Sequence, residues 1–282
     1  MWNNIKFQAQ KTKLIDQIKQ DPYLSQIIQE LELNDQEIIY KYSDLIDIKL
    51  RQLNPQEYMD ELKIIRTNKG TLQTLRFLVD NAKSRQYLFD NLILYKQLGI
   101  IKSDKIFSQI QSNSNTPSQI INYRQKLKNS KEQINKGFML SGENIDRISK
   151  ILSTIVNEWV FARKTVSYIN ISYLMDYFRN NFSVIDNTLL NIVDDLSKVD
   201  VLILDNLGYE QLPKWFLEKL IKILEFRVFN QKLTYIGSYF PLNFLSQHLF
   251  LENNNQKKPF INNLNKRFIS LIIQLIEFEL EI

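Results

Sequence analysis

Apolar residues recur mainly at intervals of three and four over the first 90 positions of the chain, which is the spacing of one face of an α-helix. Asn34 is a suitable cap for one such helix, and further helices are expected to begin near Pro55 and near Thr71. None of these segments has the spacing of a catalytic or metal-binding motif. The pattern therefore predicts a small all-helical N-terminal domain over residues 1–90, with apolar positions at Leu14, Ile15, Ile18, Leu24, Ile27, Ile28 and Leu31.

Residues 91–136 interrupt this pattern. The apolar stretch LILYKQLGII is followed by SQIQSNSNTPSQ, in which Ser, Asn and Pro favour a loop. A helix around Ile120 and Tyr123 then ends in the charged run KLKNSKEQINK, which is typical of a solvated surface. We interpret residues 91–136 as a connector between two domains.

From Gly137 onward, short apolar runs alternate with segments of helical period. Strands that alternate with helices are typical of a parallel sheet with right-handed crossovers. Residues 137–282 are therefore predicted to form an α/β domain in which helices flank a parallel sheet. Its strands are expected at GFMLSG, TVSYINIS, VLIL and LTYIGSYF.

The run Val201–Leu204 consists of four apolar residues without alternation, as in a strand that is buried on both faces. We expect it to be a central strand, beside the strands that end near Gly142 and near Ser238. Because successive side chains of a strand point to opposite faces, Ile203 should be buried on one face of the sheet and the two leucines of the run on the other.

Asp205 follows this strand at the carboxyl edge of the sheet, where open α/β sheets bind ligands. Gly208 can take the positive φ of a tight turn. An acid in this position resembles the Walker B aspartate that holds Mg²⁺ in P-loop ATPases. The alternative is a buried strand whose aspartate stabilises the following turn, and the segment from 201 to 210 by itself favours neither interpretation.

Composition narrows the functional classes. Hydrophobic residues make up 44% of the 282 positions, which is enough for a folded core. A net charge of +5 permits contact with nucleic acid without requiring it. The absence of cysteine excludes disulfides and cysteine-ligated zinc, and the single histidine, His248, has no partner for a metal site. No apolar run reaches the roughly 20 residues of a membrane span, and the first residues lack the apolar segment of a signal peptide, so we expect a cytoplasmic protein without a membrane partner.

The order of these elements and the residues within them resemble the AAA+ module of bacterial replicative helicase loaders, the DnaI and DnaC family with its IstB relatives. The segment KWFLEKLIKILEFRVFNQKLTYIGS is similar to the loader segment that joins the Walker B strand to the sensor I strand, and NLNKRFISL is similar to the segment with the loaders' late arginine. The resemblance covers residues 137–275. It implies a P-loop fold, a nucleotide site, a DnaB-type replicative helicase as partner, contact with single-stranded DNA, and self-association.

The resemblance places a P-loop on residues 142–149, where two essential residues differ. A P-loop has the pattern G-x-x-x-x-G-K-[ST], whose backbone N–H groups and lysine bind the phosphates and whose hydroxyl binds Mg²⁺. Gly142 and Ser149 match its first and last positions, but Arg147 replaces the second glycine and Ile148 replaces the lysine. Losing that lysine removes a charge-assisted hydrogen bond worth about 1.5–3 kcal/mol. Lys150 and Arg147 are the nearby cations, and restoring glycine at 147 and lysine at 148 is expected to improve nucleotide binding.

Two further positions of the loader pattern differ. Asn206 replaces the second Walker B acid, which would polarise the attacking water, and Tyr239 follows Ser238 where loaders carry a polar sensor residue. Asp205 remains to hold Mg²⁺. We therefore predict no catalytic residues, no ATP hydrolysis, and either no cofactor or weakly bound ATP or ADP with Mg²⁺.

The remaining candidates are cations. The resemblance aligns Arg267 with an arginine that acts in trans, whereas the alternative is a surface arginine on the last helix. Arg227 matches another loader arginine, in a role that is either structural or binding. A cluster near the end of the chain is expected either to contact DNA phosphates or to be a solvated loop, and it comprises Lys257, Lys258 and Lys266.

The combined interpretation is a helicase-loader-like protein of DNA replication that binds the helicase through residues 1–90 and works without ATP hydrolysis. Two alternatives stay open, an active AAA+ ATPase with an unconventional nucleotide loop and a non-enzymatic scaffold or regulator of the same fold. The N-terminal domain of the family often binds zinc through cysteines, and a chain without cysteine lacks that feature.

Overall fold

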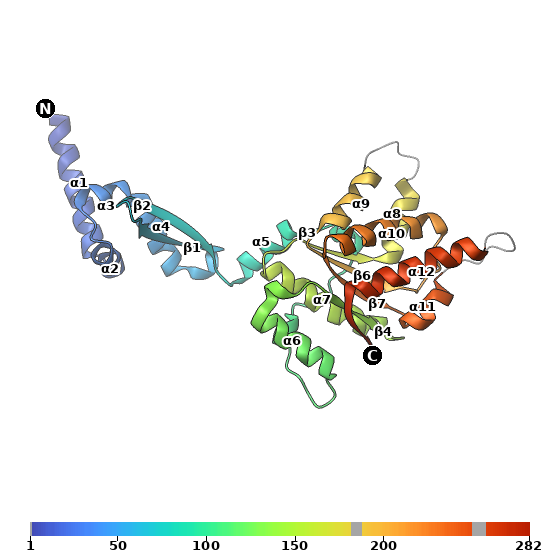
Figure 1. Cartoon of the computed structure of the whole chain (residues 1–282). Coiled ribbons are helices and arrows are strands. Elements are labelled where there is room, and N and C mark those ends of the chain that lie inside the picture. The colour runs from blue at the N-terminus through green and yellow to red at the C-terminus, as the bar shows by residue number, and fades with distance from the viewer. Residues whose placement is uncertain (1, 182–187, 250–257) are drawn as a thin grey trace. The chain divides into compact units, whose positions relative to one another are not determined.

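The computed structural model describes residues 2–181, 188–249 and 258–282, and the chain forms two compact units, Met1–Tyr87 and Leu88–Ile282 (Figure 1). We refer to them as unit 1 and unit 2. Helix α5 (Ala82–Leu92) contains the boundary between them.

Unit 1 begins with four helices, and the residues that precede two of them act as caps. The Asp21 side chain accepts hydrogen bonds from the N–H groups of Tyr23 and Leu24 at the start of the second helix. Asn34 and Glu37 form a reciprocal capping box on the third helix, which confirms the cap predicted at Asn34. The helices are α1 (Trp2–Gln20), α2 (Pro22–Glu30), α3 (Asp35–Tyr40) and α4 (Tyr42–Leu53).

The second half of unit 1 is an antiparallel hairpin formed by β1 (Asp60–Arg66) and β2 (Leu72–Leu78). The prediction of helices that begin near Pro55 and near Thr71 is therefore wrong. Buried and exposed side chains alternate from Asp60 to Ile64, which is the period of a strand. Tyr58, Leu62 and Ile65 also fall three and four apart, so the segment was compatible with a helical period as well. The N-terminal unit is therefore not all-helical.

The hairpin completes the core of unit 1. Leu62 and Ile64 of β1 pack with buried side chains of the helices, among them Leu24, Ile38 and Leu45. At the end of β1, Arg66 donates to the carbonyl of Leu31 and to Glu37, and the Arg66 guanidinium lowers the pKa of the Glu37 carboxyl to about 2.

Unit 2 contains a six-stranded parallel sheet with the strand order β3-β5-β6-β7-β4-β8. This confirms the predicted parallel α/β architecture. The strands are β3 (Ile93–Leu94), β4 (Gly137–Ser141), β5 (Val166–Asn170), β6 (Val201–Leu207), β7 (Leu233–Ser238) and β8 (Ile276–Glu281).

Helices cover both faces of this sheet. One apolar cluster joins Leu202 and Leu204 to five helices, and another joins Val201 and Ile203 to two helices. The first group is α8 (Ile171–Asn181), α9 (Thr188–Lys198), α10 (Lys214–Phe229), α11 (Leu242–His248) and α12 (Lys258–Leu275), and the second is α6 (Ser118–Ser130) and α7 (Ile145–Phe161). The predicted division of the residues of β6 between the two faces is confirmed.

The predicted neighbours of β6 are only half right. It pairs with β7, as expected, but its other neighbour is β5, and β7 separates it from β4. Because every central strand is apolar on both faces, periodicity identifies the strands without specifying which of them pair.

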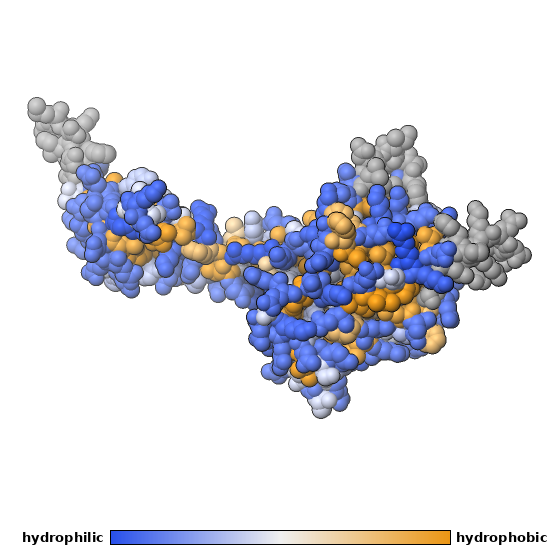
Figure 2. Space-filling view, in the orientation of Figure 1, coloured by the Kyte–Doolittle hydropathy of each residue, from blue (hydrophilic) through white to orange (hydrophobic). Residues whose placement is uncertain are grey.

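The predicted connector contributes to unit 2. Its residues form β3 and α6, and Phe107, Tyr123 and Leu127 are fully buried in the cluster beneath the sheet. Polar residues cover most of the visible surface of both units in Figure 2. No helix in the described parts of the chain has the length and apolar character needed to span a bilayer.

Candidate nucleotide-binding site

The carboxyl ends of β4, β6 and β7 bring several predicted site residues together. The Gly142 N–H donates to the Ser238 carbonyl at 3.1 Å, which joins the end of β4 to the end of β7. A Cβ atom on Gly237 would lie 2.5 Å from Asp205 Oδ1 and 2.9 Å from Ile148 Cγ2. The fold therefore places this acid of β6 and the first turn of α7 at one edge of the sheet.

Asp205 is 2% exposed, and its carboxylate is already supplied with hydrogen-bond donors. Ser149 Oγ donates to Oδ2 at 2.6 Å, the Tyr168 hydroxyl donates to the same oxygen, and the Asn206 N–H donates to Oδ1 at 2.9 Å. Burial, followed by the charge of Asp205, raises the pKa of Tyr168, so the tyrosine keeps its proton. Coordination of Mg²⁺ by Asp205 would displace donors that the protein itself provides.

Removing the Tyr168 hydroxyl should destabilise unit 2 in the absence of any nucleotide. Tyr168→Phe deprives the buried Asp205 of one donor, and a hydrogen bond to a charged group is worth about 1.5–3 kcal/mol. Urea denaturation followed by the fluorescence of Trp159 and Trp215, which both lie in unit 2, measures the loss. The control is Tyr173→Phe, an exposed tyrosine that should change the free energy of unfolding by less than about 0.5 kcal/mol. Equal stability of the two variants would contradict the structural role of Tyr168.

The segment aligned with the P-loop has a helical backbone where a phosphate loop would be. Helix α7 begins at Ile145, and the side chain of its cap, Asn144, accepts from the Arg147 N–H at 3.1 Å. The N–H groups of Ile145 and Ile148 donate to the carbonyls of Glu143 and Asn144. A P-loop binds phosphate through free backbone N–H groups. Here three of those groups are used within the segment.

Local packing explains the glycine at position 142 without any contact to phosphate. Its φ is +149°, and a Cβ atom would lie 2.3 Å from the carbonyl oxygen of Ile282. The Ile282 N–H in turn donates to the Ser141 carbonyl at 2.8 Å. Gly142 therefore accommodates the close approach of the chain just after β8.

Ile148, in the position of the P-loop lysine, belongs to the core. Its side chain is 0% exposed and packs in the cluster that contains Leu152, Ile203 and Tyr235. The two cations considered as substitutes, Arg147 and Lys150, are exposed, and neither lines the pocket at this edge of the sheet.

That pocket has a volume of about 660 Å³ and an acidic lining. It contains three carboxylates, from Glu143, Asp146 and Glu210, and one cation, Lys102. Lys102 donates to Asp146 at 2.6 Å, and this hydrogen bond lowers the pKa of Asp146. The excess of negative charge repels a polyphosphate. Asn206, at φ +62°, also lines the pocket, and its buried Oδ1 has no hydrogen-bond donor among the residues described.

Ser238 and Tyr239, which align with the sensor segment of loaders, stabilise the turn after β7. Ser238 is fully buried, and its hydroxyl contacts the carbonyls of Leu207 and Phe240 at 3.0 and 2.6 Å. The Tyr239 N–H donates to the Leu207 carbonyl at 2.8 Å, and its side chain lines the acidic pocket. Among the described residues, no three His, Asp or Glu side chains are grouped so that they could hold a metal ion.

Two of the predicted basic residues near the end of the chain, Arg267 and Lys266, are described, and neither lines the pocket at this site. Arg267 is exposed on α12 and forms an ion pair with Glu225 of α10. Lys266 is exposed on the same helix. Lys258 begins α12, with its side chain outside the described part, and Lys257 lies outside the described residues.

Arg227 has a structural role, which its sequence position left open. It is 0% exposed, and its guanidinium donates to the carbonyls of Leu196, Val199 and Leu233 at 3.0, 2.8 and 2.6 Å. Burial lowers its pKa to about 9, which leaves it charged at neutral pH. A cation at the end of a helix satisfies carbonyls that lack intrahelical partners. Arg227 thus joins α10, the end of α9 and β7.

Sequence reasoning missed Tyr168 as a donor to Asp205, the proximity of Ile282, and the acidity of the pocket. The acids Glu143 and Asp146 are visible within the aligned P-loop, where their charge already opposes phosphate binding. The hydrogen bond from Tyr168 to Asp205 and the proximity of Ile282 depend on strand pairings that no local motif specifies.

Comparisons with known proteins identify the fold of the chain. No protein-family profile matches it, and no curated protein does. Among solved structures, a crystal structure of DnaI matches with a TM-score of 0.51 and 21% sequence identity, over 68% of this chain and 95% of the DnaI chain. The chain has a DnaI-like fold.

Two further solved structures also match the chain. The replication initiator DnaA bound to AMPPCP and single-stranded DNA matches with a TM-score of 0.50 and 12% identity, over 65% of this chain and about half (51%) of the DnaA chain. The DnaC helicase loader matches with a TM-score of 0.45 and 16% identity, over 62% of this chain and 95% of the loader chain. At these identities the likeness establishes the fold alone. The parallel α/β fold predicted from the sequence is confirmed.

A nucleotide with Mg²⁺ does not fit the site of this DnaI-like fold. Three of the N–H groups that would bind phosphate are used within the segment, the lysine position is an apolar core residue, and the pocket carries an excess of carboxylates. These features are independent of one another, and each opposes the binding of a polyphosphate.

Proposed function

We propose that this chain is a helicase-loader-like protein of DNA replication that acts without hydrolysing ATP. Unit 1 binds a DnaB-type replicative helicase, and unit 2 contacts single-stranded DNA and other subunits. The observation that carries the proposal is the DnaI-like fold, which extends over 95% of the DnaI chain. The loader-like segments from Lys214 to Ser238 and around Arg267 support it independently, because a fold alone does not determine a function.

The geometry of the aligned P-loop supports the second part of the proposal. Helix α7 begins before the position of the P-loop lysine, and Asn144 occupies an N–H group that a phosphate would need. The same features oppose the alternative of an active ATPase with an unconventional loop. A scaffold or regulator without loading activity is the alternative that binding experiments must separate.

The test of the helicase partner uses the full chain and the hexameric replicative helicase of the same organism. We expect the two to co-elute in size-exclusion chromatography, and the chain to increase the amount of helicase loaded on single-stranded DNA circles. Both results should be the same with ATP, with ADP and without nucleotide. Absence of a complex, or a complex that forms only with ATP, would contradict the proposal. A complex without stimulated loading would identify a scaffold or regulator.

Contact with single-stranded DNA is proposed for the basic cluster near the end of the chain. Replacing Lys257, Lys258 and Lys266 with Gln should weaken binding of single-stranded DNA and reduce its dependence on salt. Each lost phosphate contact lowers the slope of log K against log salt concentration by about 0.7 for a single strand. Fluorescence anisotropy of a labelled oligonucleotide from low to moderate salt measures both quantities.

The matched control for this experiment replaces three exposed lysines elsewhere in the chain, Lys13, Lys69 and Lys222, with Gln. It removes the same net charge and should change the salt slope less than the cluster variant does. If the two triple variants have the same affinity and slope, the cluster is a solvated surface and the DNA contact lies elsewhere or does not exist.

A further inference from the structure

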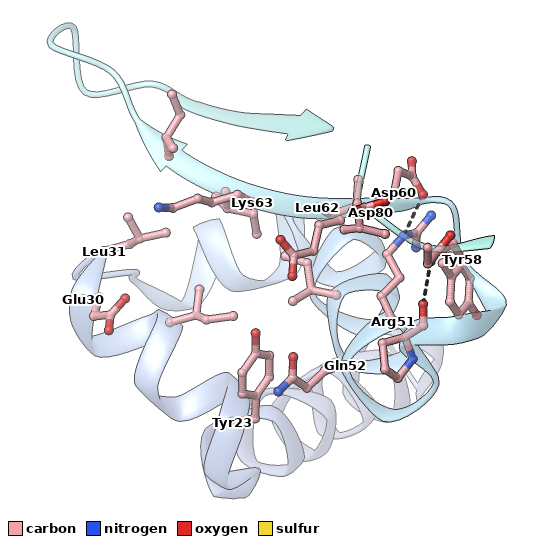
Figure 3. Close-up of a pocket in the computed structure, with 18 of the residues that line it drawn as sticks. Tyr23, Glu30, Leu31, Arg51, Gln52, Tyr58, Asp60, Leu62, Lys63 and Asp80 are labelled. Carbon is pink, nitrogen blue, oxygen red and sulfur yellow. Dashed lines mark hydrogen bonds and ion pairs between the residues drawn. The ribbon is translucent and has the colours of Figure 1, made fainter. Parts of the chain in front are cut away.

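A groove in unit 1 follows the unpaired edge of strand β1. Its volume is about 730 Å³, and it lies between β1 and the helices α2 and α4 (Figure 3). All seven residues of β1 line the groove, whereas no residue of β2 does. The groove therefore runs along the side of β1 that faces away from its partner strand. Its apolar floor comprises Ile27, Leu31, Ile48, Leu62 and Ile64.

The backbone of β1 is available on this side. The hairpin is a two-stranded sheet, and in the described part of the chain no hydrogen bond from another element reaches the outward N–H and carbonyl groups of β1. An unpaired strand edge is a template for another strand, and proteins that use such an edge for recognition place pockets for alternate side chains beside it.

Two arginines that line the groove, one beside each end of β1, already have partners. Arg51 donates to Asp60 at 3.2 Å and lies 4.6 Å from the centre of the Tyr58 ring. At the other end, Arg66 donates to Glu37 at 2.7 Å and to the carbonyl of Leu31 at 2.9 Å. These contacts leave the charges of both arginines satisfied.

Two charges on β1 remain without a partner. Glu61 and Lys63 are exposed on the face of the strand opposite to Leu62, and neither forms an ion pair with any residue that the structure describes. Opposite charges directly across a strand pair stabilise it, and like charges destabilise it. We therefore expect β1 to pair best with a strand that carries a positive charge opposite Glu61 and a negative charge opposite Lys63.

We propose that this groove binds an extended segment of a partner protein as a third strand, antiparallel to β1. The segment has an acidic, an apolar and a basic residue in succession, opposite Lys63, Leu62 and Glu61 respectively. Its apolar residue points to the floor of the groove, and its charged residues lie on the solvent face. The proposal does not depend on the helicase being the partner, because it concerns only the chemistry of the bound strand.

A second copy of this chain is a less suitable occupant. Its own β1 contains the succession Glu61, Leu62 and Lys63, but that edge is recessed in the same way. Tyr23 and Glu30 of α2 line the far side of the groove (Figure 3). Two such edges could approach only if the α2 helices of both copies moved aside, whereas a single extended segment enters without that change.

The test uses the full chain and a fluorescent, capped peptide, Thr-Val-Glu-Val-Arg-Thr, with anisotropy as the readout. We expect saturable binding, and binding about tenfold weaker for the charge-reversed peptide Thr-Val-Arg-Val-Glu-Thr, since two cross-strand charge pairs become repulsive. The double variant Glu61→Lys with Lys63→Glu should reverse this preference. A control charge swap on α1, Lys13→Glu with Asp16→Lys, should leave it unchanged.

Three results would overturn the proposal. The first is equal binding of the two peptides, or no binding of either. The second is unchanged binding after methylation of the peptide N–H groups that face β1, because strand pairing requires them. The third is a dimer of the full chain in sedimentation analysis that Glu61→Lys alone dissociates, because a lysine at position 61 of one copy would then face Lys63 of the other; this would make a second copy the occupant. No helicase enters these assays, so they are independent of the proposed loader function.

Discussion

Ile148→Lys, which restores the P-loop lysine, is expected to unfold unit 2 rather than to create a nucleotide site. Ile148 is 0% exposed among apolar side chains. A fully buried lysine has its pKa lowered by about 3–5 units from its usual value of about 10.4, so the amine is largely neutral in the folded state and the loss at pH 7 is about 4–5 kcal/mol. That loss is comparable to the whole stability of a typical domain, about 5–15 kcal/mol. We therefore expect that Ile148→Lys alone does not improve nucleotide binding.

Urea denaturation monitored by tryptophan fluorescence measures the effect of this substitution. Ile148→Val is the apolar control, with an expected loss of about 0.5–1.5 kcal/mol. Arg147→Lys, at the exposed neighbouring position, should be neutral. An Ile148→Lys protein that is as stable as the valine variant and binds ATP would show that the segment can open into a P-loop.

Arg227→Ala is expected to destabilise unit 2 by about 3–5 kcal/mol, because it removes a buried cation whose hydrogen bonds join two helices and a strand. The carbonyls of Leu196, Val199 and Leu233 would stay buried without a donor, and an unsatisfied buried group costs about 1–3 kcal/mol. Arg227→Lys should recover little, since an ammonium group cannot reproduce the planar fork of a guanidinium.

The matched control is Arg179→Ala, which removes an arginine from the exposed side of α8. It should change the free energy of unfolding by less than about 0.5 kcal/mol. The same denaturation experiment compares the two variants. If Arg227→Ala were as stable as the control and instead weakened binding of DNA or a partner, Arg227 would have the binding role that its sequence position also allowed.

The sequence predicts unit 2 well because its strands are unbroken apolar runs between amphipathic helices. Val201–Leu204 could be assigned as a buried strand and its residues to the correct faces. The pairing of β6 with β5 could not, because neighbouring strands are equally apolar. The edge strand β8 was missed because it is polar at alternate positions, as edge strands often are.

Unit 1 was predicted less well for a different reason. In β1, the spacing of Tyr58, Leu62 and Ile65 satisfies a helical period, while the burial of Asp60, Leu62 and Ile64 follows a period of two. A short segment permits both interpretations, and tertiary packing against the helices decides between them.

For the candidate site, the sequence identified the residues that meet at the edge of the sheet but not what they do there. The absence of the lysine and of the second acid was visible in Ile148 and Asn206. The capping of α7 by Asn144, the donation from Tyr168 to Asp205 and the approach of Ile282 to Gly142 depend on tertiary structure. These contacts, together with the absence of the P-loop lysine and the second acid, make the segment unsuitable for binding phosphate.

The most direct test of this account is the thermal unfolding of the full chain, with and without millimolar ATP or ADP and Mg²⁺. A ligand that binds only the folded state raises the melting temperature, by an amount equivalent to about 2.7 kcal/mol at a concentration of 100 Kd. The account predicts no change in the melting of unit 2 with either nucleotide. A saturable increase that Asp205→Asn abolishes would contradict it, because it would show that the edge of the sheet still binds a nucleotide through Mg²⁺.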